Sequence, residues 1–271
     1  MTLTMNRRSF LQGTAGLTFL MGAQGITAVR SEAATGALDV NHWLTIRADG
    51  TILVVHPSTE MGQSSYSTLP QILAEELDAD WADIEIEQLN ADDRRFGNQL
   101  FGGVLYTAGS TGTQFYFDPM RKAGAQARDV LLQIAARAWG VDKSTLRTDP
   151  SVVVGPDGQT AGYGALAALG ADGITVPDVD TVALKDRAQF RIIGHDVPRR
   201  DVPAKSTGQA VYAIDVDVPN MAYGAVLRAP VEDEVPLSVD DTAARDIPGV
   251  IDVVTLPDGV AVVAESLWSA L

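Results

Sequence analysis

Two short segments of the sequence combine glycine with hydroxyl and amide side chains just before a helix-forming stretch. The first is Ser58-Thr59-Glu60-Met61-Gly62-Gln63-Ser64, and the second is Thr107-Ala108-Gly109-Ser110-Thr111-Gly112-Thr113. The N-terminus of a helix presents free N–H groups and the positive end of the helix dipole, which favour anionic ligands. Glycine lets a ligand approach the backbone closely, and glutamine offers both a donor and an acceptor. Together the two loops could hold a polyanionic ligand from two sides.

Both loops also have an ordinary structural interpretation. Serine, threonine and glycine are common at helix N-caps and in loops that bind nothing. Glu60 is open to the same interpretation, because a carboxylate in a loop is usually solvated. These residue types alone leave both interpretations open.

The elements that must position the loops form a strand–loop–helix pattern that occurs twice. Asp49-Gly50 joins two β-rich runs, which predicts a hairpin because the turn needs a positive φ that glycine accepts. Leu69, Ile72, Leu73 and Leu77 recur at helical spacing after the first loop. In this half we predict strands at residues 42–46, 51–56 and 84–87, a long loop at 90–112, and helices at 65–77 and 115–139 with Gly140 as C-cap.

The remaining sequence predicts shorter elements and a second unit. We predict strands at residues 152–154, 190–193, 210–218, 221–228, 250–255 and 260–264, and helices at 163–171 and 240–246. The sequence pattern changes near residue 197. From there, short predicted strands separated by turns indicate a separate unit. The predicted fold class is α+β, with an α/β segment at 39–197 followed by a second domain at 198–271.

The first 34 residues are predicted to be a twin-arginine signal peptide rather than part of the fold. Arg7-Arg8 precede Ser9-Phe10-Leu11, a weakly apolar stretch follows over 13–29, and Ser31-Glu32-Ala33-Ala34 offers small residues for cleavage. The alternative is a transmembrane anchor, but the stretch is rich in Gly and Thr and short for a span of ~20 residues. The signal predicts a periplasmic protein that is exported in its folded state.

Composition excludes several other classes of protein. The chain has no cysteine, so neither a disulfide nor a cysteine-bound iron–sulfur cluster can form within it. His42, His56 and His195 have no partner at zinc-site spacing, and each is predicted to be a surface or satisfied core histidine. A net charge of −15 disfavours nucleic acid as a partner. No nucleophile elbow, P-loop or dinucleotide fingerprint is present in the sequence.

Several motifs in order resemble one known family over nearly the whole chain after the signal. Glu60-Met61-Gly62-Gln63, Thr68-Leu69-Pro70 and residues 73–81 are similar to the molybdenum-binding subunit of the xanthine dehydrogenase and aldehyde oxidase superfamily, in its exported branch. Residues 120–128 resemble the helix after that family's second cofactor loop. Residues 201–210, 214–216 and 248–250 resemble the family's α/β-hammerhead domain.

The resemblance implies a molybdenum cofactor, and in this branch molybdopterin cytosine dinucleotide. The residues that match the cofactor-contacting loops are Met61, Gly62, Gln63 and Ser64 in the first loop, and Gly109, Ser110 and Thr111 in the second. Ser64 departs from the family, which usually has glycine at this position, so its side chain either crowds the ligand or caps the helix. No catalytic residue and no metal ligand is assigned, because the family's catalytic glutamate lies in a part of the subunit beyond the residues matched here.

The function implied is an exported oxidoreductase subunit that acts on aldehydes or N-heterocycles with water as the oxygen source. Because this chain has no cysteines, the resemblance implies a small 2Fe–2S partner subunit, with a cytochrome c subunit as a further candidate. Two alternatives stay open, namely a truncated, inactive fragment and a non-catalytic periplasmic binding or scaffold module of the same fold.

Overall fold

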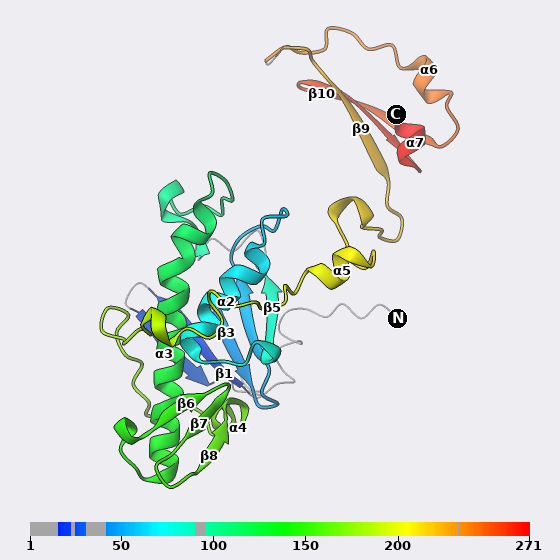
Figure 1. Ribbon diagram of the computed structural model, residues 1–271. Coiled ribbons are helices and arrows are strands. Elements are labelled where there is room, and N and C mark those ends of the chain that lie inside the picture. The colour runs from blue at the N-terminus through cyan, green and yellow to red at the C-terminus, as the bar shows by residue number, and fades with distance from the viewer. Residues whose placement is uncertain (1–15, 23–24, 31–41, 90–95, 232) are drawn as a thin grey trace. The chain divides into compact units, whose positions relative to one another are not determined.

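The computed structural model describes residues 16–22, 25–30, 42–89, 96–231 and 233–271, which belong to two compact units (Figure 1). The first unit ends at Ser206, whereas the domain boundary predicted from the sequence lies near residue 197. The intervening residues are fastened to the first unit by hydrogen bonds. Trp81 Nε1 donates to the Pro198 carbonyl at 2.9 Å, and the Arg200 amide donates to Ser67 Oγ at 2.9 Å.

A five-stranded sheet forms the centre of the first unit, with strand order β2-β1-β3-β4-β5. Its strands are β1 (Gly16–Gly22), β2 (Gly25–Arg30), β3 (His42–Arg47), β4 (Ile52–His56) and β5 (Ile84–Gln88). β3 and β4 are antiparallel, and Gly50 has a φ of +98° in the turn between them, so the predicted hairpin is confirmed. β5 is parallel to β4 and is reached through a helix, which makes a βαβ unit.

Two helices follow the two loops and pack against each other. α2 (Ser65–Leu77) lies against β4 and β5 and against α3 (Thr111–Trp139) (Figure 1). α3 begins four residues earlier than the predicted 115, and it ends at Gly140, which has a φ of +67° as the predicted cap. The core includes Leu44, Ile46, Ile52, Leu69, Leu73, Leu77, Met120, Leu131 and Ile134. Among the described residues, no helix is long and apolar enough to cross a bilayer.

Two strands lie within the N-terminal segment that is predicted to be a signal peptide. β1 and β2 pair with each other, and β1 pairs antiparallel with β3. Their sequences carry Ile, Val, Phe and Thr between glycines, and such runs suit pairing with the free edge of a neighbouring strand. The twin arginines and the residues at 31–34 lie outside the described part of the chain, so the signal itself stays a prediction.

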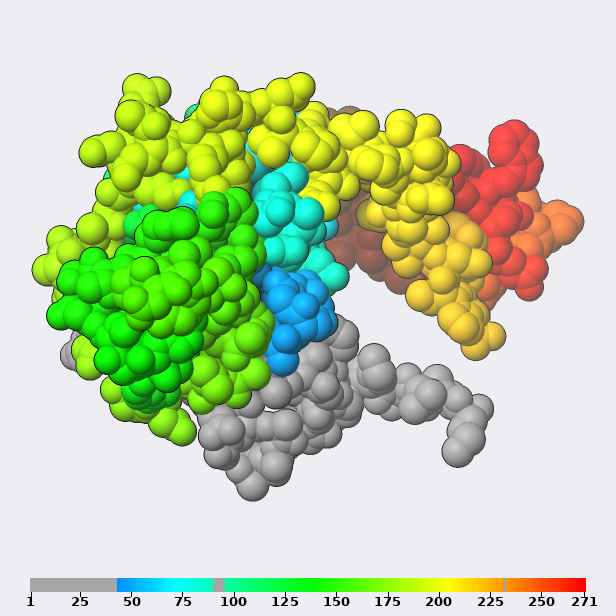
Figure 2. Space-filling view, turned by 60° about the horizontal axis from the view of Figure 1, so that its bottom comes forward, coloured from blue at the N-terminus to red at the C-terminus, as the bar shows by residue number. Residues whose placement is uncertain are grey.

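A small sheet and a long irregular segment complete the first unit. The sheet consists of β6 (Arg147–Asp149), β7 (Val152–Val154) and β8 (Thr160–Gly162), and α4 (Tyr163–Ala168) follows it. Figure 2 shows the chain between α4 and α5 (Val202–Ser206), in yellow-green, spread over one face of the unit. Helical turns lie at Trp81–Asp83, Gln99–Phe101, Lys143–Thr145 and Arg187–Gln189.

The second unit is a small α+β arrangement. Its sheet has the order β10-β11-β9, from Val250–Leu256, Gly259–Ala264 and Tyr223–Arg228, with the short helices α6 (Thr242–Arg245) and α7 (Leu267–Ala270). The strand predicted at 210–218 is absent from this described segment, which instead contains a helical turn at Ala213–Asp215. Asp215 Oδ2 accepts the Tyr212 amide at 3.0 Å, and this capping bond uses a donor that a strand would need.

Candidate functional site

The structure brings the two predicted loops into direct contact. Ser58 Oγ lies 3.0 Å from Thr107 Oγ1, and the Thr59 amide donates to the same Thr107 oxygen at 3.0 Å. Because α2 and α3 pack side by side, their N-termini are held next to each other. Two loops that are separated by almost fifty residues therefore form one continuous surface.

The seven predicted site residues all reach this surface. Met61, Gly62, Gln63, Gly109 and Ser110 are exposed, while Ser64 and Thr111 are half-buried. A Cβ added at Gly62 would meet no atom within 4 Å, and at Gly109 only the Thr111 methyl group at 3.8 Å. Both glycines thus leave backbone open to an approaching ligand.

Ser64 and Ser110 hold the same unusual position in their loops. Each is the N-cap of its helix, with a φ of 72° for Ser64 and 57° for Ser110, and neither side chain makes a capping hydrogen bond. The left-handed region disfavours residues with a Cβ. The left-handed φ would suit glycine at the Ser64 position, and the Ser64 side chain makes no hydrogen bond that caps α2.

Replacing Ser64 with glycine is expected to stabilise the protein by about 0.5–1 kcal/mol, because the left-handed strain disappears and no capping bond is lost. Chemical denaturation measures the change. Ser144→Gly is the matched control, since Ser144 lies in a helical turn with negative φ and should lose about 0.5–1 kcal/mol. A destabilised Ser64→Gly variant would contradict the strain argument.

Glu60 is not the solvated loop carboxylate that the sequence suggested. Its side chain is only 11% exposed, and its oxygens accept the amides of Gly62 at 2.8 Å, Tyr66 at 3.0 Å and Ser64 at 3.3 Å. Lys205 Nζ lies 3.4 Å from Glu60 Oε1. Burial would raise the pKa of Glu60, but these amides and the Lys205 charge together hold the pKa below its usual value. The carboxylate is therefore an internal anion at the N-terminus of α2.

The Gln63 amide group also turns back into its own loop. Its Oε1 accepts the Met61 amide at 2.6 Å, and its Nε2 donates to the Thr59 carbonyl at 2.6 Å and to Ser65 Oγ at 2.9 Å. Gln63 thereby fixes the backbone of Met61 and Gly62 from behind. Met61 of the same loop is 66% exposed.

His56 supports this loop from the core side. It is fully buried, its Nδ1 lies 2.9 Å from Gln88 Oε1, and its Nε2 lies 3.1 Å from Ser65 Oγ. Burial lowers the pKa of His56, which favours the neutral ring. Gln88 in turn donates to the Ser58 carbonyl at 2.8 Å. The predicted role of a satisfied core histidine is confirmed for His56.

Among the described residues, no carboxylate accepts the first amides of α3, whereas Glu60 accepts amides at the N-terminus of α2. No acidic residue lies in the first turn of α3, and Ser110 makes no side-chain cap. Thr111 Oγ1 donates to the Ala108 carbonyl at 2.8 Å, which leaves its lone pairs as acceptors. The first amides of a helix have no intrahelical acceptor, and in α3 the Thr111 amide donates to the Ala108 carbonyl of the loop at 3.3 Å. The anion-binding capacity predicted for both helix N-termini therefore lies mainly at α3.

Three buried carboxylates at the other end of α2 fasten the segment before α5. Glu75 Oε2 accepts the amides of Arg191 at 2.9 Å, Ile192 at 2.7 Å and Ile193 at 3.0 Å. The predicted strand at 190–193 is therefore wrong, because three successive N–H groups converge on one carboxylate and do not alternate along an edge. Glu76 and Asp78 are also buried and bind Arg121, Lys185 and Arg191.

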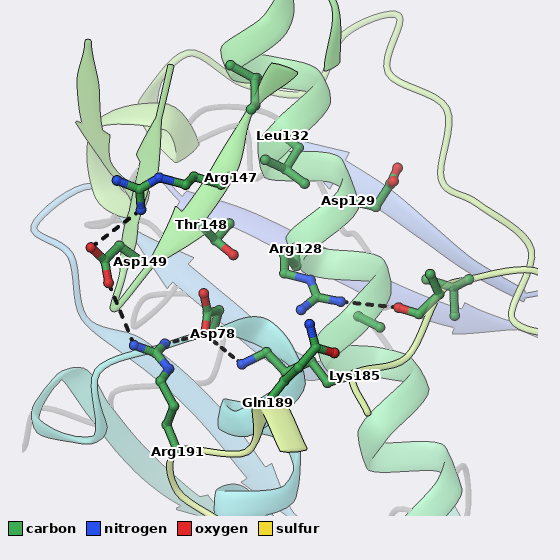
Figure 3. A pocket seen from close by; sticks show the side chains of 14 residues that line it. Asp78, Arg128, Asp129, Leu132, Arg147, Thr148, Asp149, Lys185, Gln189 and Arg191 are labelled. Carbon is green, nitrogen blue, oxygen red and sulfur yellow. Dashed lines mark hydrogen bonds and ion pairs between the residues drawn. The ribbon is translucent and has the colours of Figure 1, made fainter. Parts of the chain in front are cut away.

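A pocket of about 520 Å³ lies beside this network, between α3, β6 and residues 182–191 (Figure 3). The charged side chains around it mostly bind one another. Arg191 pairs with Asp78 and Asp149, and Arg147 Nη1 lies 3.6 Å from Asp149 Oδ2 (Figure 3). None of the seven predicted site residues lines this pocket. The joined loops, and not the pocket, form the candidate site.

The residues that hold the site together were not identified from their sequence context. Glu60 was interpreted as solvated, and Thr107 and Gln88 were given no separate role, although each carries a bond between or behind the loops. Lys205 had a signal in the sequence, because it lies within the run at 201–210 that carried the family resemblance. Among the described residues, no cluster of three or more His, Asp or Glu side chains is arranged to hold a metal ion.

Comparison with known proteins gives a family and two long relatives. Residues 4–227 match the family described as the molybdopterin cofactor-binding domain. The chain is 38% identical to the beta subunit of isoquinoline 1-oxidoreductase from Brevundimonas diminuta, over 99% of this chain and 39% of that protein. It is 30% identical to a membrane-bound aldehyde dehydrogenase (pyrroloquinoline-quinone) from Gluconacetobacter polyoxogenes, over 99% of this chain and 36% of that protein. The chain thus spans less than half the length of either relative.

Among solved structures, the carbon monoxide reduced state of Cu,Mo-CO dehydrogenase is similar with a TM-score of 0.39 and 22% sequence identity. The match covers 57% of this chain and 19% of that chain.

Proposed function

We propose that this chain, which belongs to the molybdopterin cofactor-binding domain family, contributes the two joined loops as part of the cofactor site of a molybdenum oxidoreductase. The family match confirms the resemblance to molybdenum-binding subunits of the xanthine dehydrogenase and aldehyde oxidase superfamily. The observation that carries the proposal is the contact of Ser58 and Thr59 with Thr107, which places an open loop beside an uncapped helix N-terminus.

The residues present fit a pterin cofactor that carries phosphate groups. Gly62 and Gly109 leave open space where a side chain would stand, and the first turn of α3 has amides and contains no acidic residue. Gly109, Ser110 and Thr111 would hold the anionic part of the cofactor. Met61, Gly62 and the backbone that Gln63 fixes would hold a neutral part, since Glu60 already occupies the N-terminus of α2. The cofactor form we propose is molybdopterin cytosine dinucleotide.

The cofactor and the chain have different roles in this proposal. When bound, the cofactor supplies the oxidation of the substrate with water as the oxygen source. The chain binds and orients the cofactor through backbone groups at Gly62 and Gly109, which leave open space where a side chain would stand. Substrates proposed from the relatives' names are aldehydes or N-heterocycles such as isoquinoline.

The whole enzyme requires more than this chain in our proposal. A small 2Fe–2S subunit would take the electrons, because this chain has no cysteine for a cluster, and a cytochrome c subunit is a further candidate. The second unit is proposed to be the start of an α/β-hammerhead domain. Export to the periplasm through the twin-arginine route fits a protein that folds around its cofactor in the cytoplasm.

Gln63→Ala tests the loop assignment. Removing three hydrogen bonds that shape the loop is expected to lower molybdenum and pterin content by about tenfold, as is typical when a residue that orients a site is lost. Metal analysis and pterin fluorescence of the purified protein, produced with its neighbouring genes, measure the content. Gln159→Ala is the control, because Gln159 bonds only within its own surface turn.

The outcomes separate the proposal from its rivals. Wild-type protein without molybdenum or pterin would favour a fragment or a scaffold module, and a quinone in their place would favour the cofactor in the second relative's name. Equal molybdenum content in Gln63→Ala and Gln159→Ala would remove the first loop from the site.

A further inference from the structure

Lys205 connects the end of the first unit to the first loop of the candidate site. It lies in α5, and its Nζ is 2.7 Å from Asp201 Oδ2 and 3.4 Å from Glu60 Oε1. Asp201 is itself held by Arg199, whose Nη2 lies 2.6 Å from the same carboxylate. The Lys205 side chain is 28% exposed and the Glu60 side chain 11%, so the pair is mostly shielded from water. The contact between Lys205 and Glu60 joins residues that are 145 positions apart in the sequence.

Glu60 needs a positive partner to keep its place. A mostly buried carboxylate loses hydration, and this loss must be offset by hydrogen bonds and by an opposite charge. The amides of Gly62, Ser64 and Tyr66 supply the hydrogen bonds. Among the described residues, Lys205 is the cation that has a side-chain nitrogen within 4 Å of a Glu60 carboxylate oxygen.

The same carboxylate determines the shape of the loop. Three amides between residues 62 and 66 point inward at Glu60, and these residues include the open Gly62 and the strained Ser64. If the carboxylate moved into solvent, the three N–H groups would lose their acceptor together. The left-handed conformation at Ser64 would then lose the hydrogen bonds to Glu60 that offset its strain.

We propose that Lys205 is a positioning residue, whose ammonium group holds Glu60 in place and so fixes the first loop against the N-terminus of α3. The contact between α5 and the loop is a latch between the end of the first unit and the site. The latch is a property of this chain alone, while its value for cofactor binding rests on the proposed function.

Amide hydrogen exchange of the full chain without cofactor tests the latch directly. Lys205→Met removes the charge and keeps most of the side-chain volume. We expect exchange at the amides of Gly62, Ser64 and Tyr66 to become about three- to tenfold faster, the change typical of losing one partly shielded ion pair. Lys205→Arg should restore slow exchange, because it keeps the charge.

A matched control separates the latch from general destabilisation. Lys143 pairs with Asp129 at 2.7 Å at another place in the first unit, so Lys143→Met should leave the three loop amides unchanged. The double variant Lys205→Met/Glu60→Gln should exchange its loop amides no faster than Glu60→Gln alone. Unchanged exchange in Lys205→Met, or equal acceleration in Lys143→Met, would overturn the proposal.

Cofactor content of the same variants shows whether the latch matters for the proposed function. Faster loop exchange in Lys205→Met together with lower molybdenum content supports both proposals. Faster exchange with unchanged molybdenum content keeps the latch and removes the first loop from the cofactor site. Slow exchange with lower molybdenum content overturns the latch and leaves the cofactor proposal standing.

Discussion

Glu75→Ala is expected to lower the free energy of unfolding of the first unit by about 3–5 kcal/mol, as is typical when one partner of a buried ionic network is removed. The Glu75 carboxylate is fully buried, accepts three amides from residues 191–193, and lies 3.0 Å from Lys185 Nζ. Alanine would leave all four donors without this acceptor in a dry environment. Urea denaturation followed by tryptophan fluorescence measures the loss.

The control for this prediction is a glutamate that also forms an ion pair but is exposed. Glu85 lies 3.0 Å from Arg47, yet its side chain is 58% exposed, so Glu85→Ala should cost at most about 1 kcal/mol. If the two variants lose similar stability, burial of the Glu75 network does not matter as we argue.

The pH dependence gives a second readout of the same network. Burial raises the pKa of Glu75, but the amides of Ile192 and Ile193 together with Lys185 outweigh burial and leave the pKa below its usual value. A group with a lowered pKa stabilises the fold fully above its unfolded pKa, and this stabilisation is lost as the pH falls through the folded pKa. The difference in stability between wild type and Glu75→Gln should therefore shrink below about pH 4.

Local signals were enough to predict the elements that carry the site. Asp49-Gly50 determined a hairpin, and the leucines of 65–77 determined a helix, because both signals depend only on neighbours along the chain. Glycine and hydroxyl residues before each helix identified both loops as candidates. That the loops touch follows from the packing of α2 on α3, which neither loop encodes by itself.

Long-range partners explain what the sequence did not predict. In the sequence, Glu60 and Glu75 look like ordinary charged residues. Their partners Lys205 and Arg191 lie more than a hundred positions away along the chain. Residues 190–193 carry β-branched side chains and were predicted as a strand, but the Glu75 carboxylate gathers their amides. A carboxylate in a loop or on a helix surface is usually solvated, so only the tertiary structure shows that Glu60 and Glu75 are buried.

Gly124→Ala is expected to destabilise the protein by about 2 kcal/mol, although alanine is intrinsically the better helix former by about 1 kcal/mol. Gly124 lies in α3 where the helix crosses α2. A Cβ at this position would collide with the Leu73 carbonyl and lie 2.9 Å from the Leu77 amide nitrogen. Both neighbours are helix backbone, which cannot rotate away as a side chain can, so α2 and α3 must move apart.

The sign of this effect is what tests the argument, because helix propensity and packing predict opposite outcomes. Gly112→Ala makes the same substitution in the same helix, where the new Cβ would lie 3.4 Å from Ser58 Oγ, a distance that a side chain can accommodate. That control should be neutral or slightly stabilising. A stabilised Gly124→Ala variant would show that the helices are not in close contact. If the helices separate, Ser58 and Thr59 should also move away from Thr107. Gly124→Ala should therefore lower cofactor content, although Gly124 lies in the buried helix interface and not in either loop.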